Sequence, residues 1–169
     1  YTLSLHDALP ISINPGEKVA IIGRIGSGKS TIQKLITSLY YADQGSVLID
    51  GIDIKQLDPA ELRKNISYVA QDTLLFNGSV RENIMYRAPR SSDEDIIRAA
   101  TISGVMNFVQ RNPQGFDLPV GEKGSLLSGG QVQAIAIARA ILINCPIVLM
   151  DEPSNQMDRN SEQHFIKHI

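Results

Sequence analysis

A glycine-rich segment near the start of the chain restricts the possible folds more than any other feature of the sequence. It reads Gly23-Arg24-Ile25-Gly26-Ser27-Gly28-Lys29-Ser30 and matches the pattern G-x-x-x-x-G-K-[ST] at every fixed position. The apolar run at 19–22 predicts a strand before it, and residues 31–39 predict a helix after it. A strand, a tight loop and a helix in this order predict an α/β domain with a phosphate-binding loop.

The residue types in this segment explain how it would bind phosphate. Its glycines allow backbone conformations closed to other residues, so that successive N–H groups can surround phosphate oxygens. Lys29 adds a positive charge for the outer phosphates, and the Ser30 hydroxyl can ligate Mg²⁺. The alternative is a glycine-rich turn without a ligand. The predicted nucleotide-binding residues are Gly23, Arg24, Ile25, Gly26, Ser27, Gly28, Lys29, Ser30 and Thr31.

Two adjacent acids follow a second apolar run, at 147–150, which reads as a strand buried on both faces. A carboxylate at the carboxyl end of such a strand faces the ligand crevice of an α/β sheet, so Asp151 is predicted to hold Mg²⁺. Glu152, one residue further on, could polarise a water for attack on the terminal phosphate. The alternative is a pair of solvated acids in the loop before Pro153.

A third motif, Leu127-Ser128-Gly129-Gly130-Gln131, lies between the first two, and with it the chain resembles the nucleotide-binding domain of an ABC transporter over residues 13–162. In that family this motif is the signature, which contacts the ATP held by a second domain. The helix that we expect over 131–143 would direct its positive end at the terminal phosphate of that ATP. The resemblance also implies that Gln71 reaches the Mg²⁺ and the attacking water, and that Asp158 is the D-loop aspartate. It implies ATP and Mg²⁺ as cofactors, Glu152 and Gln71 as catalytic residues, and Ser30, Gln71 and Asp151 as metal ligands.

The resemblance implies a P-loop ATPase fold with a mostly parallel core sheet, a small antiparallel β part and an inserted helical subdomain at about 90–128. Local signals agree with it, because Asp50-Gly51 between two apolar runs predicts a hairpin, and Asp58 and Ser92 predict helix starts. We expect residues 1–12 to be a non-native or unassigned segment and residues 13–169 to be the ATPase domain, truncated at both ends. The family's adenine-stacking aromatic residue and its switch histidine find no match in the chain.

Two segments, at 75–84 and 120–124, resemble those of ABC exporters more than those of importers. The residues from Asp151 to Glu162 are also similar to bacterial type I secretion exporters, which move unfolded proteins or peptides. We therefore expect an ATPase that powers export, with type I secretion as the narrower prediction and with multidrug or lipid export left open. The alternatives are a soluble ABC ATPase that acts on DNA or ribosomes, and an inactive gene fragment.

Composition bears on the partners of the chain. The net charge is −2 and no cluster of Lys and Arg suggests nucleic acid, so none is expected as a partner. The expected partners are a second ABC ATPase domain, identical or different, and the transmembrane domains of a transporter, at the cytoplasmic face of the bacterial inner membrane. We expect Mg²⁺-dependent ATP hydrolysis from the complete parent protein and none from these 169 residues alone.

The chain departs from the family's pattern close to the expected dimer interface. Val132 stands where the family usually has Arg, and Asn155 and Gln156 replace the small residues usual before the D-loop. We expect these changes to affect signalling between two ATP sites and to leave ATP binding intact.

Overall fold

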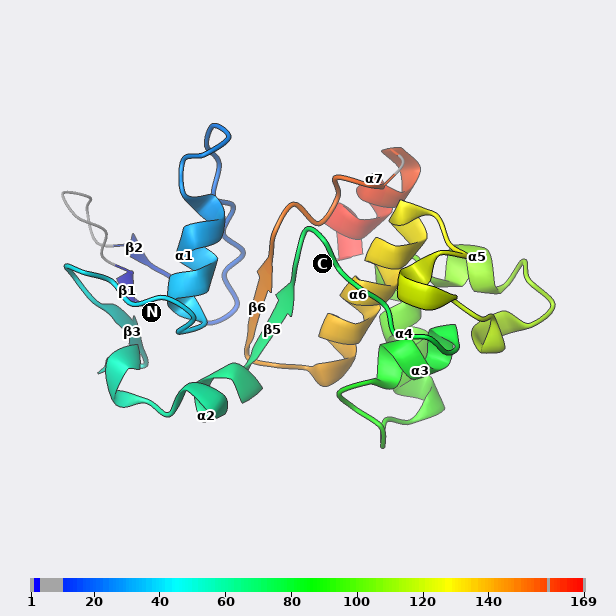
Figure 1. Ribbon diagram of the computed structural model, residues 1–169, viewed down its shortest axis with the longest axis horizontal. Helices are drawn as coiled ribbons and strands as arrows, with labels where there is room; N and C mark the ends of the chain where they lie inside the picture. Colours follow the sequence, from blue (N-terminus) through cyan, green and yellow to red (C-terminus); the bar gives the residue numbers. More distant parts are fainter. Residues whose placement is uncertain (1, 4–10, 158, 169) are drawn as a thin grey trace. The chain divides into compact units, whose positions relative to one another are not determined.

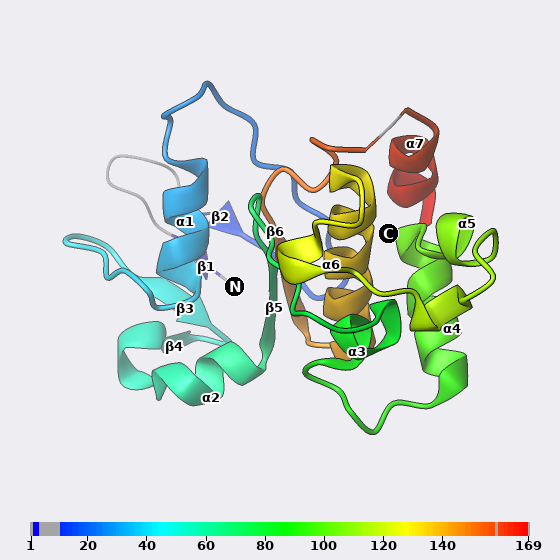
Figure 2. The ribbon, with the colours of Figure 1, turned by 45° about the vertical axis from the view of Figure 1, so that its right-hand side comes forward.

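The computed structural model describes residues 2–3, 11–157 and 159–168, and it divides into two compact units, Tyr1–Ile66 and Ser67–Ile169. Figures 1 and 2 show the elements of each unit. The strands are β1 (Thr2–Leu3), β2 (Ile11–Ser12), β3 (Val47–Ile49), β4 (Ile52–Asp53), β5 (Ile66–Val69) and β6 (Ile147–Met150). The α-helices are α1 (Lys29–Ile36), α2 (Pro59–Lys64), α3 (Val80–Met85), α4 (Asp93–Ser103), α5 (Met106–Val109), α6 (Gly129–Ile143) and α7 (Arg159–His168). Short 3₁₀ turns lie at Ile54–Gln56, Gly115–Asp117 and Glu122–Gly124.

Unit 1 contains a small antiparallel sheet with the strand order β2-β1-β3-β4. The predicted hairpin is confirmed, since β3 and β4 pair with Ile49 opposite Ile52. Asp50 and Gly51, which form the turn, have φ angles of 52° and 79°. Two consecutive left-handed residues give a two-residue turn whose twist matches that of the flanking strands, and this is why Asp-Gly predicts a hairpin.

Both helix starts predicted from the sequence are confirmed. The Asp58 carboxylate accepts from the N–H groups of Ala60, at 2.7 Å, and Glu61, at 3.0 Å, and α2 begins at the next residue. The Ser92 hydroxyl accepts from the N–H of Asp95 at 3.2 Å, and α4 begins after it. Each cap satisfies backbone donors that have no carbonyl partner in the first turn of a helix.

The strand predicted at 19–22 is not formed. The structure has no strand at these residues, and Val19, Ile21 and Ile22 are 51%, 46% and 93% exposed. A strand needs backbone partners on a neighbouring strand, and within the described residues no strand pairs with this run. An apolar run does not supply such partners by itself, so the prediction of a strand at 19–22 is wrong.

The strands β5 and β6 form a separate two-stranded sheet and run in the same direction (Figure 1). The backbone N–H of Asp151 donates to the carbonyl oxygen of Val69 at 2.9 Å, which joins the carboxyl ends of the two strands. The prediction that the run at 147–150 is buried on both faces is wrong, because Val148 is 44% exposed and the other three residues are only half-buried. Among the described strands β5 is the only neighbour of β6, so one edge of β6 has no strand beside it.

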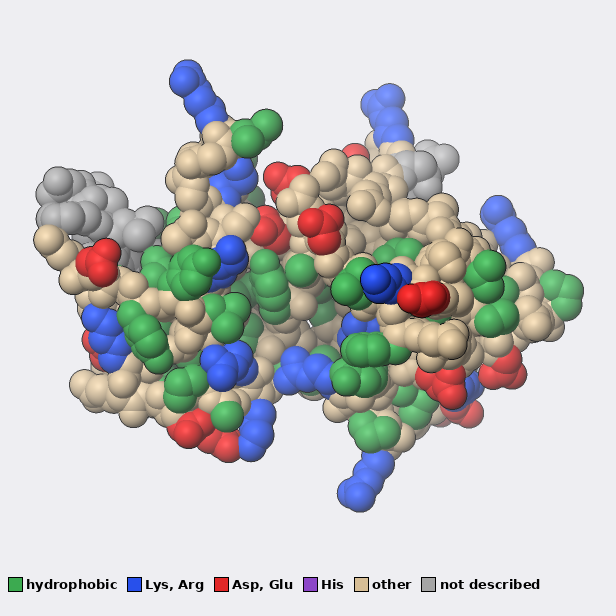
Figure 3. All heavy atoms as spheres, viewed as in Figure 1, with side chains coloured by type: hydrophobic (Ala, Val, Ile, Leu, Met, Phe, Trp, Pro, Cys, Tyr) green, Lys and Arg blue, Asp and Glu red, His purple; other side chains and the backbone are tan. Residues whose placement is uncertain are grey.

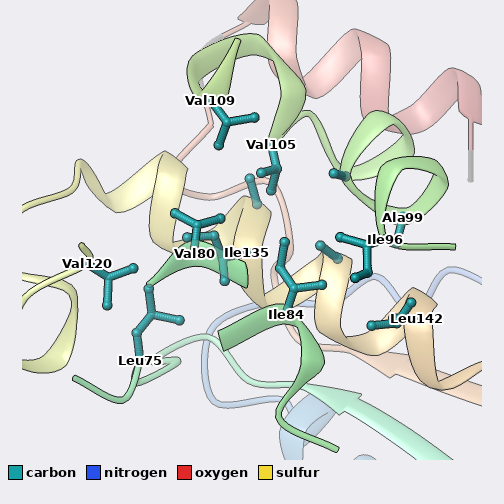
Figure 4. Packing of buried hydrophobic residues seen from close by; sticks show 13 residues of the cluster. Leu75, Val80, Ile84, Ile96, Ala99, Val105, Val109, Val120, Ile135 and Leu142 are labelled. Carbon is teal, nitrogen blue, oxygen red and sulfur yellow. The ribbon is translucent and has the colours of Figure 1, made fainter. Parts of the chain in front are cut away.

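The core of unit 2 lies among α3, α4, α5 and α6 (Figure 4). Side chains from these helices point toward one another, and Ile84 of α3, Ile96 of α4 and Ile135 of α6 are buried almost completely. Burial of one such side chain stabilises a fold by roughly 1.5–3 kcal/mol. A second cluster joins Val69 of β5 and Phe165 of α7 to the other side of α6. The position of α6 is therefore fixed by packing on two sides.

Asn83 is a buried polar side chain at the centre of a hydrogen-bond network in unit 2. Its Oδ1 accepts from the N–H of Phe76 at 2.9 Å, and its Nδ2 donates to the carbonyl oxygens of Phe76, at 2.9 Å, and Ser79, at 3.0 Å. Arg139 of α6 donates from Nε to the Asn83 carbonyl oxygen at 2.8 Å and from its guanidinium to Oδ1 at 3.1 Å. The loop before α3 is thus tied to both α3 and α6 through one side chain.

Arg139 also lies over two stacked aromatic rings. The Phe76 and Tyr86 rings are 4.2 Å apart, and the guanidinium carbon lies 5.6 Å and 5.8 Å from their centroids. Burial lowers the pKa of Arg139, although the guanidinium still carries its charge at neutral pH. The two rings are about half exposed, and hydrophobic side chains reach the surface over α3 in Figure 3. The partly buried guanidinium of Arg139 therefore holds two aromatic side chains that face the solvent.

Substitution Asn83→Ala should destabilise the protein by about 2–4 kcal/mol, because it leaves several buried donors and acceptors without partners. Calorimetric melting of the full-length protein that contains this domain measures the effect. The matched control is Asn112→Ala, which loses a single hydrogen bond to the N–H of Gln114 at 2.9 Å and should cost about 1 kcal/mol or less. Equal melting temperatures for the two variants would contradict the role given to Asn83.

Candidate functional site

The predicted phosphate loop lies in unit 1 and opens directly into α1. Gly26 and Gly28 have φ angles of 80° and 91°, in the region that residues with a side chain rarely adopt. An ideal Cβ at Gly23 would lie 2.5 Å from the hydroxyl oxygen of Ser27, so a side chain there would force this hydroxyl to rotate away. Backbone conformation therefore requires glycine at 26 and 28, and Gly23 leaves room for the Ser27 side chain.

The N-terminus of α1 has the features of an anion site. Among the described residues no side chain caps this helix, whose first N–H groups lack carbonyl partners and carry partial positive charge. Lys29 is folded onto the loop, where its Nζ donates to the carbonyl oxygens of Gly23 at 3.1 Å and Arg24 at 3.2 Å. Ser30 and Thr31 are the second and third residues of the helix. Uncapped amides and a movable ammonium group are the donors that a polyphosphate requires.

Asp151 lies in unit 2, immediately after β6 and beside the carboxyl end of β5. Its side chain is buried, with the residue 8% exposed. Burial and, to a smaller extent, the charge of Asp151 raise the pKa of the Tyr68 hydroxyl. A buried carboxylate is costly unless it is paired or coordinates a cation, so Asp151 fits a metal ligand.

Glu152 is brought together with Gln71. The Nε2 of Gln71 donates to the Oε2 of Glu152 at 3.2 Å, across 81 positions of sequence. The same carboxylate oxygen accepts from the Nδ2 of Asn155, also at 3.2 Å. Glu152 is exposed and has a φ angle of 46°, unusual for a residue with a side chain. The two residues predicted to be catalytic therefore share one site. Asn155, which the sequence indicated only as a departure near the expected dimer interface, is its third member.

The signature motif forms the start of α6. The helix begins at Gly129 and not at 131 as predicted, because Ser128 is its N-cap. The Ser128 hydroxyl accepts from the N–H of Gln131 at 3.3 Å, and the Gln131 side-chain oxygen accepts from the N–H of Ser128 at 2.9 Å. This reciprocal pair is a capping box. The pattern Ser-x-x-Gln at 128–131 is typical of one, and it predicts a helix that starts at 129. Leu127, the first residue of the motif, packs against the core of unit 2.

The two glycines of the signature allow the loop after β6 to approach closely. An ideal Cβ at Gly130 would lie 2.7 Å from the backbone oxygen of Gln156, and one at Gly129 would overlap the Gln156 side-chain oxygen. A hollow of about 620 Å³ beside them is lined in part by Asn107, Arg111 and the signature residues. The start of α6 is therefore packed on one side and open on another.

The predicted site residues fall into both units. Residues 23–31 belong to unit 1, whereas Gln71, Asp151, Glu152 and the signature belong to unit 2. Within unit 2 the structure brings Gln71 to Glu152 and the signature to the loop that follows Glu152. Asp158, predicted as the D-loop aspartate, lies outside the described residues.

The residues predicted to ligate Mg²⁺ suit that ion. A hydroxyl on Ser30, a buried carboxylate on Asp151 and the side-chain oxygen of Gln71 are the hard oxygen donors that Mg²⁺ prefers. The described residues contain no group of three or more acids, histidines or cysteines that could hold a metal ion by themselves. Mg²⁺ is usually held by one or two carboxylates together with substrate phosphates, which agrees with such a sparse set.

Comparisons with known proteins identify relatives over most of the chain. A family model described as "ABC transporter" matches residues 7–155. The ATP-dependent lipid A-core flippase of Methylobacillus flagellatus is 45% identical over 157 residues, which cover 92% of this chain and 27% of the flippase. The lipid A-core flippase of Sodalis glossinidius is 45% identical over 167 residues, which cover 98% of this chain and 28% of that protein. This chain therefore spans about a quarter of the length of the curated relatives it matches.

A solved structure has the same fold. The structure of a bacterial Atm1-family ABC exporter with ATP bound gives a TM-score of 0.81 at 39% identity, covering 85% of this chain and 25% of that chain. The P-loop ATPase fold class predicted from the sequence is confirmed by this match, and so is the resemblance to exporters. The relatives named above are lipid A-core flippases, which do not support the narrower prediction of type I secretion.

No helix in the described part of the chain is long and apolar enough to cross a membrane. The domain boundaries predicted at 1–12, 13–169 and 90–128 stay predictions.

The family match covers most of the chain, and the relatives exceed 40% identity. The chain therefore belongs to the ABC transporter family, as a nucleotide-binding ATPase domain of the exporter type.

Proposed function

We propose that this chain binds and hydrolyses ATP to drive export across a membrane, as one ATPase domain of a transporter. The observation that supports this best is the carboxylate of Glu152, held beside Gln71 at the end of a strand pair that also presents the buried Asp151. A phosphate loop alone would serve a protein that only binds nucleotide. An acid next to the expected metal ligand is needed only for the chemical step.

Nucleotide binding would use the loop and the start of α1. Lys29 now donates to two neutral carbonyl oxygens, and phosphate oxygens would be stronger, charged partners for its ammonium group. The N–H groups around Gly26 and Gly28 and the first turn of α1 would hold the remaining phosphate oxygens. Mg²⁺, when held by Ser30, Gln71 and Asp151, would supply positive charge that offsets the charge of the polyphosphate.

Hydrolysis would proceed by attack of one water molecule on the terminal phosphorus of ATP. The water oxygen forms a bond to that phosphorus while the bond to the bridging oxygen of ADP breaks, which gives ADP and inorganic phosphate. Glu152 accepts a proton from the water or orients it, and Gln71 holds the carboxylate in place and contacts the water. The proton then leaves with the phosphate or passes to the solvent, so that Glu152 is restored.

The signature would act on the nucleotide of a second ATPase domain. The N-terminus of α6 is capped in this chain by Ser128 and Gln131, yet the hollow beside Gly129 and Gly130 leaves room for another group. Two domains would then enclose two ATP molecules between the loop of one and the signature of the other. ATP binding brings the domains together and hydrolysis separates them, and this motion would be passed to transmembrane domains.

The cargo that we propose is a membrane lipid or a similar amphiphile. Two relatives named as lipid A-core flippases share 45% identity with this chain, and this supports lipid export over type I secretion. In such a protein the domain would lie at the cytoplasmic face of a bacterial inner membrane. An open reading frame without membrane helices around this domain would instead favour a soluble ABC ATPase. Stimulation of ATP hydrolysis by lipid A in the reconstituted full-length protein tests the proposed cargo.

Substitution Lys29→Ala should weaken MgATP binding by about 10- to 150-fold. The reason is the loss of a hydrogen bond to a charged group, which contributes roughly 1.5–3 kcal/mol. Calorimetric titration of the full-length protein measures the dissociation constant. Lys18→Ala, which removes an exposed lysine of the same unit, is the control and should leave the constant unchanged. If both variants bind MgATP as the unmutated protein does, the loop is not the nucleotide site.

Substitution Glu152→Gln should lower the rate of ATP hydrolysis by about 10²- to 10⁴-fold and leave ATP bound, because it removes only the proton acceptor. Steady-state turnover and nucleotide binding are measured on the same preparation. The control Glu94→Gln removes an exposed acid of α4 and should keep full turnover. Hydrolysis at the unmutated rate by Glu152→Gln would assign the chemical step to another residue.

A further inference from the structure

Asn155 and Gln156, in the loop from Glu152 to Met157, contact the two parts of the site in unit 2. We infer that Asn155 is a positioning residue that holds the Glu152 carboxylate in its working orientation. Gln156 fixes the loop that carries both residues against the start of α6. This inference rests on the proposed role of Glu152 in ATP hydrolysis.

The side chain of Asn155 contacts the carboxylate directly. Its Nδ2 lies 3.2 Å from Oε2 of Glu152, the oxygen that also accepts from Nε2 of Gln71 at 3.2 Å. Both donors therefore end on one oxygen, which leaves Oε1 to accept a proton from water. An amide donor carries no charge, so it can orient a carboxylate without neutralising it as Lys or Arg would. An alanine at position 155 would have no donor for this oxygen.

The backbone of the loop supports the same arrangement. Glu152 has a φ angle of 46°, which residues with a side chain adopt only when their surroundings hold them there. The N–H of Asn155 donates to the carbonyl oxygen of Glu152 at 3.1 Å, and the N–H of Met157 donates to that of Ser154 at 3.0 Å. These two successive turns reverse the direction of the chain and bring the Asn155 side chain next to the Glu152 carboxylate.

Gln156 fixes the far end of this loop. Its backbone oxygen lies where a Cβ on Gly130 would be only 2.7 Å away, and its side-chain oxygen lies against Gly129. The backbone of the loop can occupy this place only because Gly130 has no side chain, and Gly129 leaves room for the Gln156 side chain. Glu152 is therefore linked through Asn155 and Gln156 to the helix start that would contact the second nucleotide.

Replacement of the donor tests the inference in the full-length protein. Asn155→Leu and Asn155→Asp keep the approximate shape of the side chain and remove the N–H, whereas Asn155→His restores a neutral N–H donor at pH 8. We expect the first two variants to lower kcat for ATP hydrolysis by about tenfold, as the loss of one hydrogen bond to a charged group implies, with KM for ATP unchanged. Asn155→His should recover most of the turnover. Asn112→Asp, which keeps the acceptor that bonds to the N–H of Gln114, is the control and should match the unmutated protein.

The outcomes separate the inference from the function on which it rests. An unchanged kcat in Asn155→Leu and Asn155→Asp would overturn the inference. A lower kcat accompanied by a raised KM and a lowered melting temperature would also overturn it, because that pattern indicates general damage to the structure. If Glu152→Gln lowers turnover by about 10²- to 10⁴-fold in the same assay, the proposed catalytic role of Glu152 stands in either case. Asn155→Leu should lower turnover no further when Glu152→Gln is already present, because its effect acts through that carboxylate. An additional loss in the double variant would also overturn the inference.

Discussion

The close approach between the start of α6 and the loop after β6 is the contact on which the site in unit 2 depends. Gly129 and Gly130 bring no side chain to this contact, and the backbone oxygen of Gln156 occupies the space that a Cβ on Gly130 would need. The other residues of the signature also act within their own chain, since Ser128 and Gln131 cap α6 and Leu127 packs on the core. A substitution in the signature therefore changes the chain's own packing as well as any contact with a second domain.

The helix α6 gives this contact a rigid support. It is buried between the helical core and the cluster that contains Val69 and Phe165, and Arg139, near its middle, ties it to Asn83 and to the loop before α3. The same helix therefore carries the signature at its start and, at Arg139, contacts the exposed Phe76 and Tyr86 rings. The loop after β6 carries the strained backbone of Glu152 at one end and Gln156 near the other. The residues proposed for chemistry and for interdomain contact therefore belong to one connected structure.

The sequence predicted the features that local chemistry determines. The Asp50-Gly51 hairpin and the caps at Asp58 and Ser92 depend on nearby backbone groups, and all are confirmed. The strand expected at 19–22 failed because strand formation depends on a partner that an apolar pattern does not contain. The hydrogen bond from Asn155 to Glu152 was missed although it spans only three residues, because it forms across a turn with left-handed backbone at Glu152. The pair Asn83–Arg139 was missed because its hydrogen bonds depend on three-dimensional packing. An arginine inside the apolar run of α6 was the only signal for this pair, since such a residue needs a partner.

Complementation between two inactive variants tests whether residues of two domains complete one ATP site. Lys29→Ala damages the phosphate loop and leaves the signature intact, whereas Ser128→Asp places a negative charge at the signature, keeps a helix-capping oxygen and leaves the contact between Gly130 and Gln156 unchanged. Full-length proteins that carry these substitutions are assayed for ATP hydrolysis alone and together, with differently tagged copies to show that heterodimers form. We expect each variant alone to be inactive and the mixture to regain activity, because the heterodimer keeps one intact composite site. Activity in the mixture no higher than in either variant, with heterodimers present, would contradict it.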